Sequence, residues 1–206
     1  MLSDRMKPLM SSAGRDWETP PELFDPLNEL FDFDLDVCAT KENTKTEKFI
    51  SPEDDAFSTE WDGARMWMNP PYGKGEKRCK YPLDKCAKKK CVERGHHLLQ
   101  DSPGIGEWVN RAYEQVEKHG STVACLLPAR TDTRWFQAVW DHAALICFFR
   151  GRYKFVGADS GATFPSVLAV FSARELPDSI YEGMTLLGNV IDPREGMVMI
   201  FDSKRT

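Results

Sequence analysis

The sequence predicts an α/β domain with a mostly parallel central sheet and helices on both faces. Segments with helical apolar spacing alternate with short apolar runs along most of the chain, which is the pattern of such folds. The length of 206 residues suits one compact domain over residues 1–206. A content of 41% hydrophobic and 29% charged residues indicates a folded globular chain and excludes collagen-like or wholly disordered classes.

The first half of the chain contains one expected helix and two expected strands. The helix spans residues 20–31, because Thr19 can act as its N-cap, Pro20 suits the first helical position, and four apolar side chains share one face. Residues 33–39 alternate and then turn apolar, as a strand does. Residues 65–68 are a second short apolar strand, and the two prolines that follow end it.

The second half continues the alternation. The expected elements, in order, are a helix at residues 108–116 that ends near Gly120, a buried strand at 122–128, a helix at 135–140, and strands at 144–149 and 167–171. The last thirty residues are expected to add a late strand or hairpin, with residues 198–201 as the candidate. In sheets of this class, ligands bind beyond the carboxyl ends of the strands.

Residues 73–103 interrupt this pattern and are interpreted as an insertion, because they are polar, basic and rich in cysteine without helical or strand periodicity. The net charge of −5 would by itself argue against a nucleic-acid partner. However, residues 74–94 contain nine basic and three acidic residues, a local charge of +6 that leaves −11 for the rest of the chain. This asymmetry predicts that the insertion contacts nucleic acid.

The six cysteines are expected to be reduced thiols or metal ligands, because the chain has neither a secretory signal nor an apolar run long enough to cross a bilayer, and a cytoplasmic location follows. Three thiols and one imidazole suit tetrahedral zinc. The hypothesis is a structural zinc site formed by Cys79, Cys86, Cys91 and His96, with His97 as the alternative fourth ligand. A flexible basic loop with reduced thiols is the alternative to a metal.

The sequence Asn69-Pro70-Pro71-Tyr72 directly follows the strand at 65–68. Consecutive prolines fix φ and donate no hydrogen bond, so the turn is stiff and offers acceptors. The Asn69 side-chain oxygen and the Pro70 carbonyl can accept both hydrogens of an exocyclic amine, which makes its nitrogen a nucleophile toward an electrophilic methyl group. Tyr72 would offer a flat face to the heterocycle. The alternative is a strand-ending proline turn with a capping asparagine.

Together with three other blocks, this turn resembles the S-adenosylmethionine-dependent amino methyltransferases, and among them the short DNA N6-adenine methyltransferase family common in phages. The matching blocks are residues 17–39, 61–72, 126–133 and 150–155. The resemblance implies a Rossmann-like methyltransferase fold. It also implies methyl transfer from S-adenosylmethionine to the N6 amino group of adenine in DNA, after the base is flipped out of the duplex.

The resemblance also implies a cofactor site. The helix start in such enzymes lies beside the cofactor's carboxylate, and a helix N-terminus favours anions. In the family, the acid at the end of the first strand faces the cofactor's amino group, and Asp36 matches this acid, with Asp34 as the alternative. An acid followed by an aromatic residue brackets the cofactor's adenine, and Asp55 with Phe57 is the nearest match. Glu42 is a candidate for binding the ribose. The implied cofactor residues are Thr19, Pro20, Asp36, Cys38, Ala39, Asp55 and Phe57, with Cys38 and Ala39 standing where the family has a glycine-rich turn.

Residues 150–155 place three cations and two aromatics together. Cations can hold phosphates while an aromatic ring lies against an unstacked base, although an ordinary strand with a solvated basic face would have the same composition. The residues expected to contact DNA, including those of the insertion, are Lys88, Lys89, Lys90, Arg130, Arg150, Arg152, Lys154 and Phe155.

Three other functions use the same features. Turns of this kind also occur in enzymes that methylate RNA bases or protein glutamine side chains, because the chemistry requires only a planar amine. A zinc-stabilised DNA-binding module on an inactive methyltransferase scaffold is the non-enzymatic alternative. The basic insertion favours nucleic acid over protein, and the intact turn favours an enzyme. The sequence therefore predicts an adenine-specific DNA methyltransferase, which would act in the bacterial host cytoplasm if phage-encoded.

Overall fold

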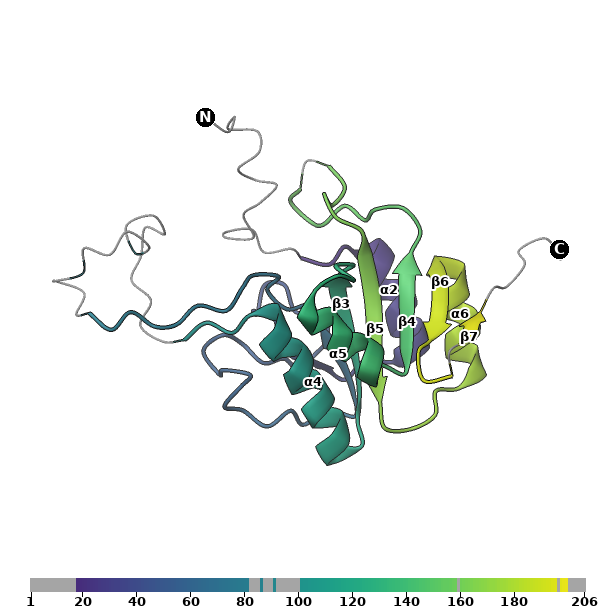
Figure 1. Cartoon of the computed structure of the whole chain (residues 1–206), viewed down its shortest axis with the longest axis horizontal. Helices are drawn as coiled ribbons and strands as arrows, with labels where there is room; N and C mark the ends of the chain where they lie inside the picture. The colour runs from purple at the N-terminus through teal and green to yellow at the C-terminus, as the bar shows by residue number, and fades with distance from the viewer. Residues whose placement is uncertain are drawn as a thin grey trace.

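The computed structural model describes residues 18–81, 86, 91, 101–158, 160–195 and 197–199. Seven strands form one sheet in the order β1-β2-β3-β5-β4-β6-β7, and Figure 1 labels the part of the sheet from β3 to β7. The strands are β1 (Leu35–Asp36), β2 (Arg65–Met68), β3 (Thr122–Pro128), β4 (Leu145–Phe149), β5 (Ser166–Ser172), β6 (Gly188–Asp192) and β7 (Met197–Met199). The helices are α2 (Pro21–Phe31), α4 (Ile105–His119), α5 (Arg134–His142) and α6 (Asp178–Leu187). The prediction of an α/β domain is confirmed.

The sheet is mixed, so the prediction of a mostly parallel sheet is wrong. β1 pairs with β2 and β2 with β3 in parallel, but β5 lies antiparallel between β3 and β4, and the β4·β6 and β6·β7 pairs are also antiparallel. All seven residues of β5 are buried. A strand buried on both faces reads as a continuous apolar run whatever its direction, so the sequence pattern reported burial and not orientation.

Helices cover both faces of the sheet, as predicted. α4 packs against α5 on one face, and α2 packs against α6 on the other (Figure 1). α4 begins after Gly104, whose backbone N–H donates to the Glu107 carboxylate at 2.7 Å, and ends at Gly120 with a φ of 67°. None of the helices in the described ranges is long and apolar enough to cross a bilayer.

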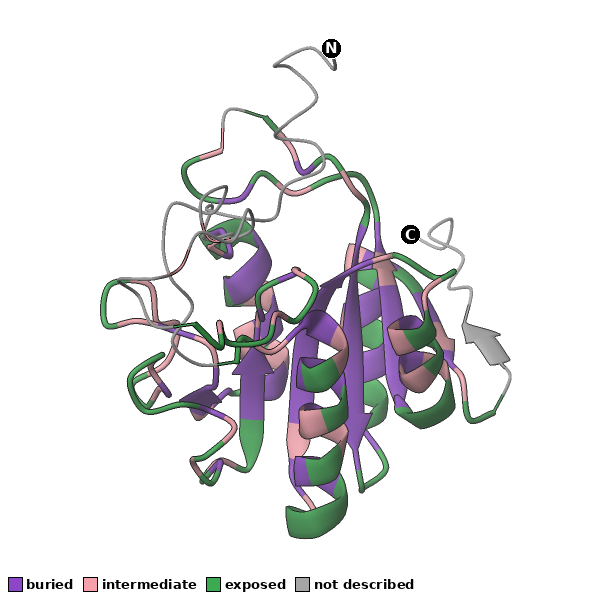
Figure 2. Ribbon diagram, turned by 60° about the vertical axis from the view of Figure 1, so that its left-hand side comes forward, coloured by how far each residue is buried: buried purple, intermediate pink, exposed green. Residues whose placement is uncertain are grey.

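The apolar core lies between the two helix layers and includes the central strands, as the buried ribbon in Figure 2 shows. β2 is held firmly in it, because Met66, Trp67 and Met68 expose at most 1% of their surface. The Phe24 and Phe33 rings pack on Trp67 with centroids 5.4 and 5.5 Å away. The turn that follows β2 is therefore anchored on a rigid base.

The C-terminal region contains a helix that the sequence analysis missed. α6 carries Ile180, Tyr181 and Met184 on its buried face, at helical spacing, so the signal was present in the sequence. β6 and β7 form the expected antiparallel hairpin, with β7 at Met197–Met199. Residues 200 and 201 of the predicted strand lie outside the described residues.

Candidate active site

The carboxyl ends of β1 and β2 lie side by side at one edge of the sheet. Asp36 pairs with Trp67 in the parallel ladder, and the Val37 N–H donates to the Trp67 carbonyl at 3.0 Å. The loop that follows Asp36 and the turn that begins at Asn69 are therefore neighbours. This is the edge at which open α/β sheets bind ligands.

A cavity of about 1080 Å³ opens at this edge. Its walls come from the entry to α2, the loop after β1, residues 50–57, the turn after β2, and α4. The foot of the insertion, where the two ends of the segment meet the domain, adds Lys77 and residues 101–103. The volume lies just above the usual range for small-molecule sites, about 300–1,000 Å³. Ten residues singled out by the sequence analysis line it: Thr19, Asp36, Cys38, Ala39, Asp55, Phe57, Asn69, Pro70, Pro71 and Tyr72.

The Asn69 side chain is held at both ends. Its Nδ2 donates to Thr19 Oγ1 at 3.1 Å, and its Oδ1 accepts from the Tyr72 hydroxyl at 2.8 Å. A carbonyl oxygen can accept two hydrogen bonds, so Oδ1 can accept from Tyr72 and from a substrate amine together. The geometry presents a fixed amide oxygen at the cavity wall, next to the carbonyl of Pro70.

Tyr72 exposes only 6% of its surface. Its ring packs edge-on against Phe164 with a centroid distance of 5.6 Å and an interplanar angle of 83°. Burial raises the pKa of the phenol far above its ordinary value, so the hydroxyl remains a donor to Asn69. Positioning of Asn69 by Tyr72, and the contact with Phe164, were both missed because no sequence pattern joins these residues.

Thr19 is not the N-cap of α2, and that prediction is wrong. Pro20 occupies the cap with φ −73° and ψ 149°, and its carbonyl accepts from the Leu23 and Phe24 N–H groups at 3.0 Å. A residue that precedes a proline is restricted to extended backbone, so Pro20 stays extended before Pro21 and the helix begins one residue late. Thr19, 2% exposed, is left to hold Asn69.

Asp36 is a buried carboxylate in the cavity wall, 3% exposed. Its two oxygens accept from the backbone N–H groups of Cys38 at 3.2 Å and Lys45 at 3.1 Å. Burial nevertheless raises the pKa of Asp36 to about 6, because the loss of hydration outweighs these hydrogen bonds and the nearby ammonium. The alternative, Asp34, accepts from the Ala64 and Arg65 N–H groups and stays outside the cavity.

Lys45 and Glu18 form an ion pair in the cavity wall, which the sequence analysis missed. Lys45 Nζ lies 2.9 Å from Glu18 Oε1, and the side chains are 16% and 30% exposed. The pair ties the loop after β1 to the segment before α2. The two residues are 27 positions apart in loops without periodicity, so nothing in the sequence pairs them.

Two aromatic rings meet at another wall of the cavity. Phe57 and Trp108 pack edge to face at a centroid distance of 4.7 Å. Asp55, with a φ of 54°, accepts from the Phe57 N–H at 3.1 Å and so fixes the local turn. Trp108 is 8% exposed, and its Nε1 has no hydrogen-bond partner among the described residues. Glu42 is exposed and lies outside the cavity lining.

The expected DNA contacts divide into three groups. Arg130 and Arg150 follow the carboxyl ends of β3 and β4, which point in the same direction as β2, and both are exposed outside the cavity lining, as are Arg152 and Lys154. Phe155 is 1% exposed in the core, so its burial contradicts the expected contact with an unstacked base. Spacing alone could not show that this ring points inward. Lys88, Lys89 and Lys90 lie outside the described residues.

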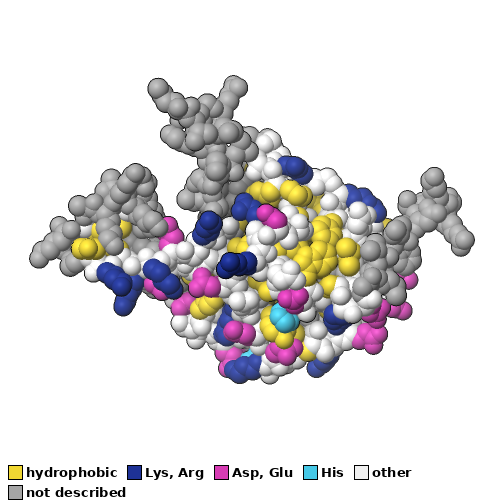
Figure 3. Space-filling view, in the orientation of Figure 1, with side chains coloured by type: hydrophobic (Ala, Val, Ile, Leu, Met, Phe, Trp, Pro, Cys, Tyr) yellow, Lys and Arg dark blue, Asp and Glu magenta, His cyan; other side chains and the backbone are white. Residues whose placement is uncertain are grey.

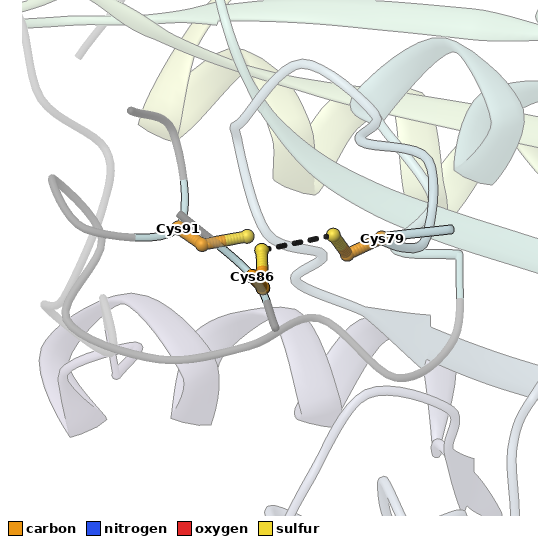
Figure 4. Close-up of side chains that lie close together, drawn as sticks. All are labelled: Cys79, Cys86 and Cys91. Atoms are coloured by element: carbon orange, nitrogen blue, oxygen red, sulfur yellow. Dashed lines mark hydrogen bonds between the residues drawn. The ribbon is translucent and has the colours of Figure 1, made fainter. Parts of the chain in front are cut away.

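The three cysteines of the insertion lie together (Figure 4). The Sγ atoms of Cys79 and Cys86 are 3.4 Å apart, and all three sulfurs, including that of Cys91, lie within 4.8 Å of one another. His96 and His97 lie outside the described residues. The thiols that the sequence hypothesis grouped are therefore brought together, although six and four residues separate them along the chain.

Comparison with known proteins gives a consistent result. Residues 8–167 match the family model for DNA N-6-adenine-methyltransferase (Dam). The chain is 30% identical over 148 residues to a DNA N-6-adenine-methyltransferase of Haemophilus phage HP1 (strain HP1c1), with 70% of this chain and 68% of that protein covered. It is 27% identical over 162 residues to one of Escherichia phage T1, with 70% of this chain and 55% of that protein covered. The chain belongs to the DNA N-6-adenine-methyltransferase (Dam) family.

Proposed function

We propose that this protein transfers a methyl group from S-adenosylmethionine to the N6 amino group of adenine in DNA. The observation that carries the proposal is the Asn69 amide, fixed at the cavity wall by Thr19 and Tyr72 beside a proline carbonyl. Membership of the family supports DNA as substrate and adenine N6 as the acceptor. The two relatives from phages HP1 and T1 carry the same name.

Asn69 and Pro70 act on the acceptor amine. Asn69 Oδ1 and the Pro70 carbonyl accept the two N6 hydrogens, which localises the nitrogen lone pair toward the methyl group. The nitrogen attacks the methyl carbon, a carbon–nitrogen bond forms, and the carbon–sulfur bond breaks with its electron pair left on sulfur. The N6 nitrogen then loses one proton to solvent. Orientation and hydrogen bonding suffice, so no strong base is needed.

The cofactor occupies the part of the cavity next to β1. Asp36 faces its ammonium group, and the α2 entry at Thr19 and Pro20 lies beside its carboxylate, although Pro20 itself is outside the lining. The loop residues Cys38 and Ala39, which line the cavity, would contact the methionyl part. The adjoining Phe57 and Trp108 rings would form one apolar wall beside the cofactor's adenine, with Asp55 holding the turn that carries Phe57.

The target adenine enters beside the Asn69 turn after it leaves the duplex, and one face of Tyr72 stacks against it. Arg130, Arg150, Arg152 and Lys154 hold phosphates at the same edge of the sheet, and Lys88, Lys89 and Lys90 do so from the insertion. The adjacent β1, β2 and β3 strands support assignment to the Rossmann-like methyltransferases. The phage relatives support action in the cytoplasm of a bacterial host.

The test is transfer of labelled methyl from S-adenosylmethionine to adenine-containing duplexes, with RNA and glutamine peptides as competing acceptors. The expected product is N6-methyladenine in DNA. Asn69→Ala should lower turnover by about 100-fold or more, since it removes a preorganised acceptor, while cofactor affinity measured by calorimetry stays within a few fold. N4-methylcytosine, or label in RNA or peptide alone, would overturn the assignment, as would unchanged turnover of the variant.

A further inference from the structure

We propose that Cys79, Cys86 and Cys91 bind a structural zinc ion that fixes the basic insertion against the rim of the cavity. The three sulfurs form a triangle with sides of at most 4.8 Å and one side of 3.4 Å. Zinc–sulfur bonds of about 2.3 Å in a tetrahedral site place two thiolates about 3.8 Å apart, so the triangle has the size of a zinc site. A disulfide would need about 2.05 Å between sulfurs, so the thiols are not bonded to one another.

The described part of the insertion lacks an apolar core that could bring the thiols together. Arg78, Lys80 and Tyr81 are exposed around Cys79, and Tyr81 exposes 51% of its surface. The three cysteines are nevertheless half-buried and converge from separate points of the segment. A bound metal supplies the energy that a short polar segment needs to hold such a shape.

The zinc site lies next to a short neck that joins the insertion to the domain. Glu76 and Ser102 exchange two backbone hydrogen bonds of 2.8 Å. Asp101 accepts from the Arg78 N–H at 2.8 Å and from Lys77 Nζ at 3.0 Å. Lys77, Asp101 and Ser102 also line the cavity. Because Cys79 follows this neck directly, a metal shared by the three thiols would tie Cys86 and Cys91 to the neck.

The insertion lies next to the cavity and is positively charged, so it can contact the DNA strand beside the target base. This role in DNA binding rests on the proposed function. Lys74, Arg78 and Lys80 are exposed at its foot, and Lys and Arg side chains gather where the insertion leaves the domain (Figure 3). Phosphates favour such cations. The zinc ion here is structural, because amine methylation needs no Lewis acid. Its role is to hold these charges in place.

The first test is the zinc content of the purified protein by mass spectrometry of the elements. One zinc per chain is expected, and replacement by cobalt should give the absorption of thiolate-bound cobalt. Cys86→Ala should lose the metal, whereas the control Cys147→Ala, a cysteine buried in β4, should retain it. Cofactor affinity of Cys86→Ala by calorimetry confirms that the domain has folded. A wild-type protein without metal, or with a Cys79–Cys86 disulfide, would overturn the proposal.

A fourth ligand completes a closed zinc site. His96→Ala and His97→Ala, measured by the same zinc assay, identify the imidazole: one of them should lose the metal or release it faster to a chelator. Retention of zinc by both variants, with unchanged release, would exclude an imidazole ligand and overturn that part of the hypothesis.

The second test concerns the role of the metal in DNA binding. Cys86→Ala should bind an adenine-containing duplex about tenfold more weakly than the wild type, because the cations that hold several phosphates become disordered. Its affinity for S-adenosylmethionine should change less than twofold. Unchanged DNA affinity in a zinc-free variant would contradict the positioning role. Zinc content is measured without any methyl transfer, so failure of the zinc proposal and failure of the proposed activity are separate results.

Discussion

At the scale of single residues, the site depends on how one amide is oriented. Thr19 accepts from the amide nitrogen of Asn69 and Tyr72 donates to its amide oxygen, and both residues are almost fully buried. In surroundings that exclude water, two such hydrogen bonds define the amide plane more firmly than they would at the surface. We therefore expect Thr19 and Tyr72 to act as positioning residues, whose loss should change turnover more than binding.

Thr19→Val keeps the shape of the side chain but removes the oxygen that accepts from Asn69 Nδ2. A typical hydrogen bond contributes about 0.5–1.5 kcal/mol, so we expect turnover to fall by about two- to tenfold as the hold on the amide weakens. Steady-state kinetics with a duplex substrate measure the effect.

The control for this experiment is Thr19→Ser, which keeps the hydroxyl and should restore most of the turnover. Valine leaves the backbone of the α2 entry in place beside the proposed carboxylate, so the KM for S-adenosylmethionine should change less than kcat in Thr19→Val. A variant with wild-type kcat would remove the Thr19 hydroxyl from the positioning role, and a change in KM alone would limit that hydroxyl to cofactor binding.

The buried Asp36 carboxyl should make the free energy of unfolding depend on pH. Its pKa rises from the ordinary 3.8 to about 6 on folding, so between these values the folded chain keeps a proton that the unfolded chain has lost. The stabilising contribution is complete below pH 3.8 and is lost as the pH rises through 6, about 3 kcal/mol in all. Chemical denaturation from pH 4 to 7 should show this fall in the wild type and its absence in Asp36→Asn.

The same titration should act in the opposite direction on cofactor binding. An ammonium group prefers the ionised carboxylate, so affinity for S-adenosylmethionine should increase as the pH rises through about 6. Calorimetry at several pH values checks this, with Asp36→Asn expected to bind weakly and without the pH dependence. Equal profiles for the two proteins would contradict a contact between Asp36 and the amino group.

At the scale of the elements, the neck of the insertion relies on two glycines. A Cβ added at Gly104 would lie 2.2 Å from the Gly75 nitrogen, and one added at Gly75 would lie 2.5 Å from the Glu107 carboxylate. The φ of −93° at Gly104 suits any residue, so the conflict is one of space. The start of α4 and the start of the insertion can approach only because both side chains are absent.

Gly104→Ala should therefore separate the neck and lower the free energy of unfolding by about 1–3 kcal/mol, as overpacking does. The control is Gly106→Ala in the same helix, whose Cβ would meet only the Trp135 Cβ, at 3.1 Å, a contact that a shift of a few tenths of an ångström relieves, and alanine is the better helix former. Denaturant unfolding compares the two. Equal stability of both variants would show that the neck can widen freely.

Much of the fold could be predicted because periodicity reports burial. β2 and β3 have the expected bounds. α2 begins one residue later than predicted, because Pro20 precedes Pro21 and therefore stays in extended backbone. The antiparallel orientation of β5 could not be predicted, because a fully buried strand has the same apolar sequence pattern in either orientation. In the site, the sequence motif brought attention to Asn69, but its bond to Thr19 spans 50 positions and exists only in the folded chain.

At the scale of the whole molecule, charge is unevenly distributed. The chain carries −5 overall, yet exposed cations occur at the foot of the insertion, and Arg130 and Arg150 follow strands that end at the edge of the sheet holding the cavity. Lys118, in contrast, lies at the far end of α4 beside Glu60. A DNA strand should therefore dock at the cavity edge and avoid the opposite one.

The salt dependence of DNA binding should identify this edge. The double variant Lys74→Gln with Lys80→Gln should reduce the slope of log affinity against log salt by about 0.9 for each phosphate that is no longer neutralised. Lys118→Gln is the matched control and should leave the slope unchanged. Fluorescence anisotropy with a labelled duplex measures both, and a similar decrease in the control would point to charge effects without a defined docking edge.

The residues that line the cavity all lie between Glu18 and Glu114. The later part of the chain, from β3 onward, supports the sheet and carries the exposed arginines that follow β3 and β4. The proposed DNA contacts therefore come from two places in the chain: the insertion, which lies within the stretch that lines the cavity, and the loops after β3 and β4. Because Arg130 and Arg150 lie outside the cavity lining, substitution of either arginine should alter the affinity for DNA while the cavity keeps its shape.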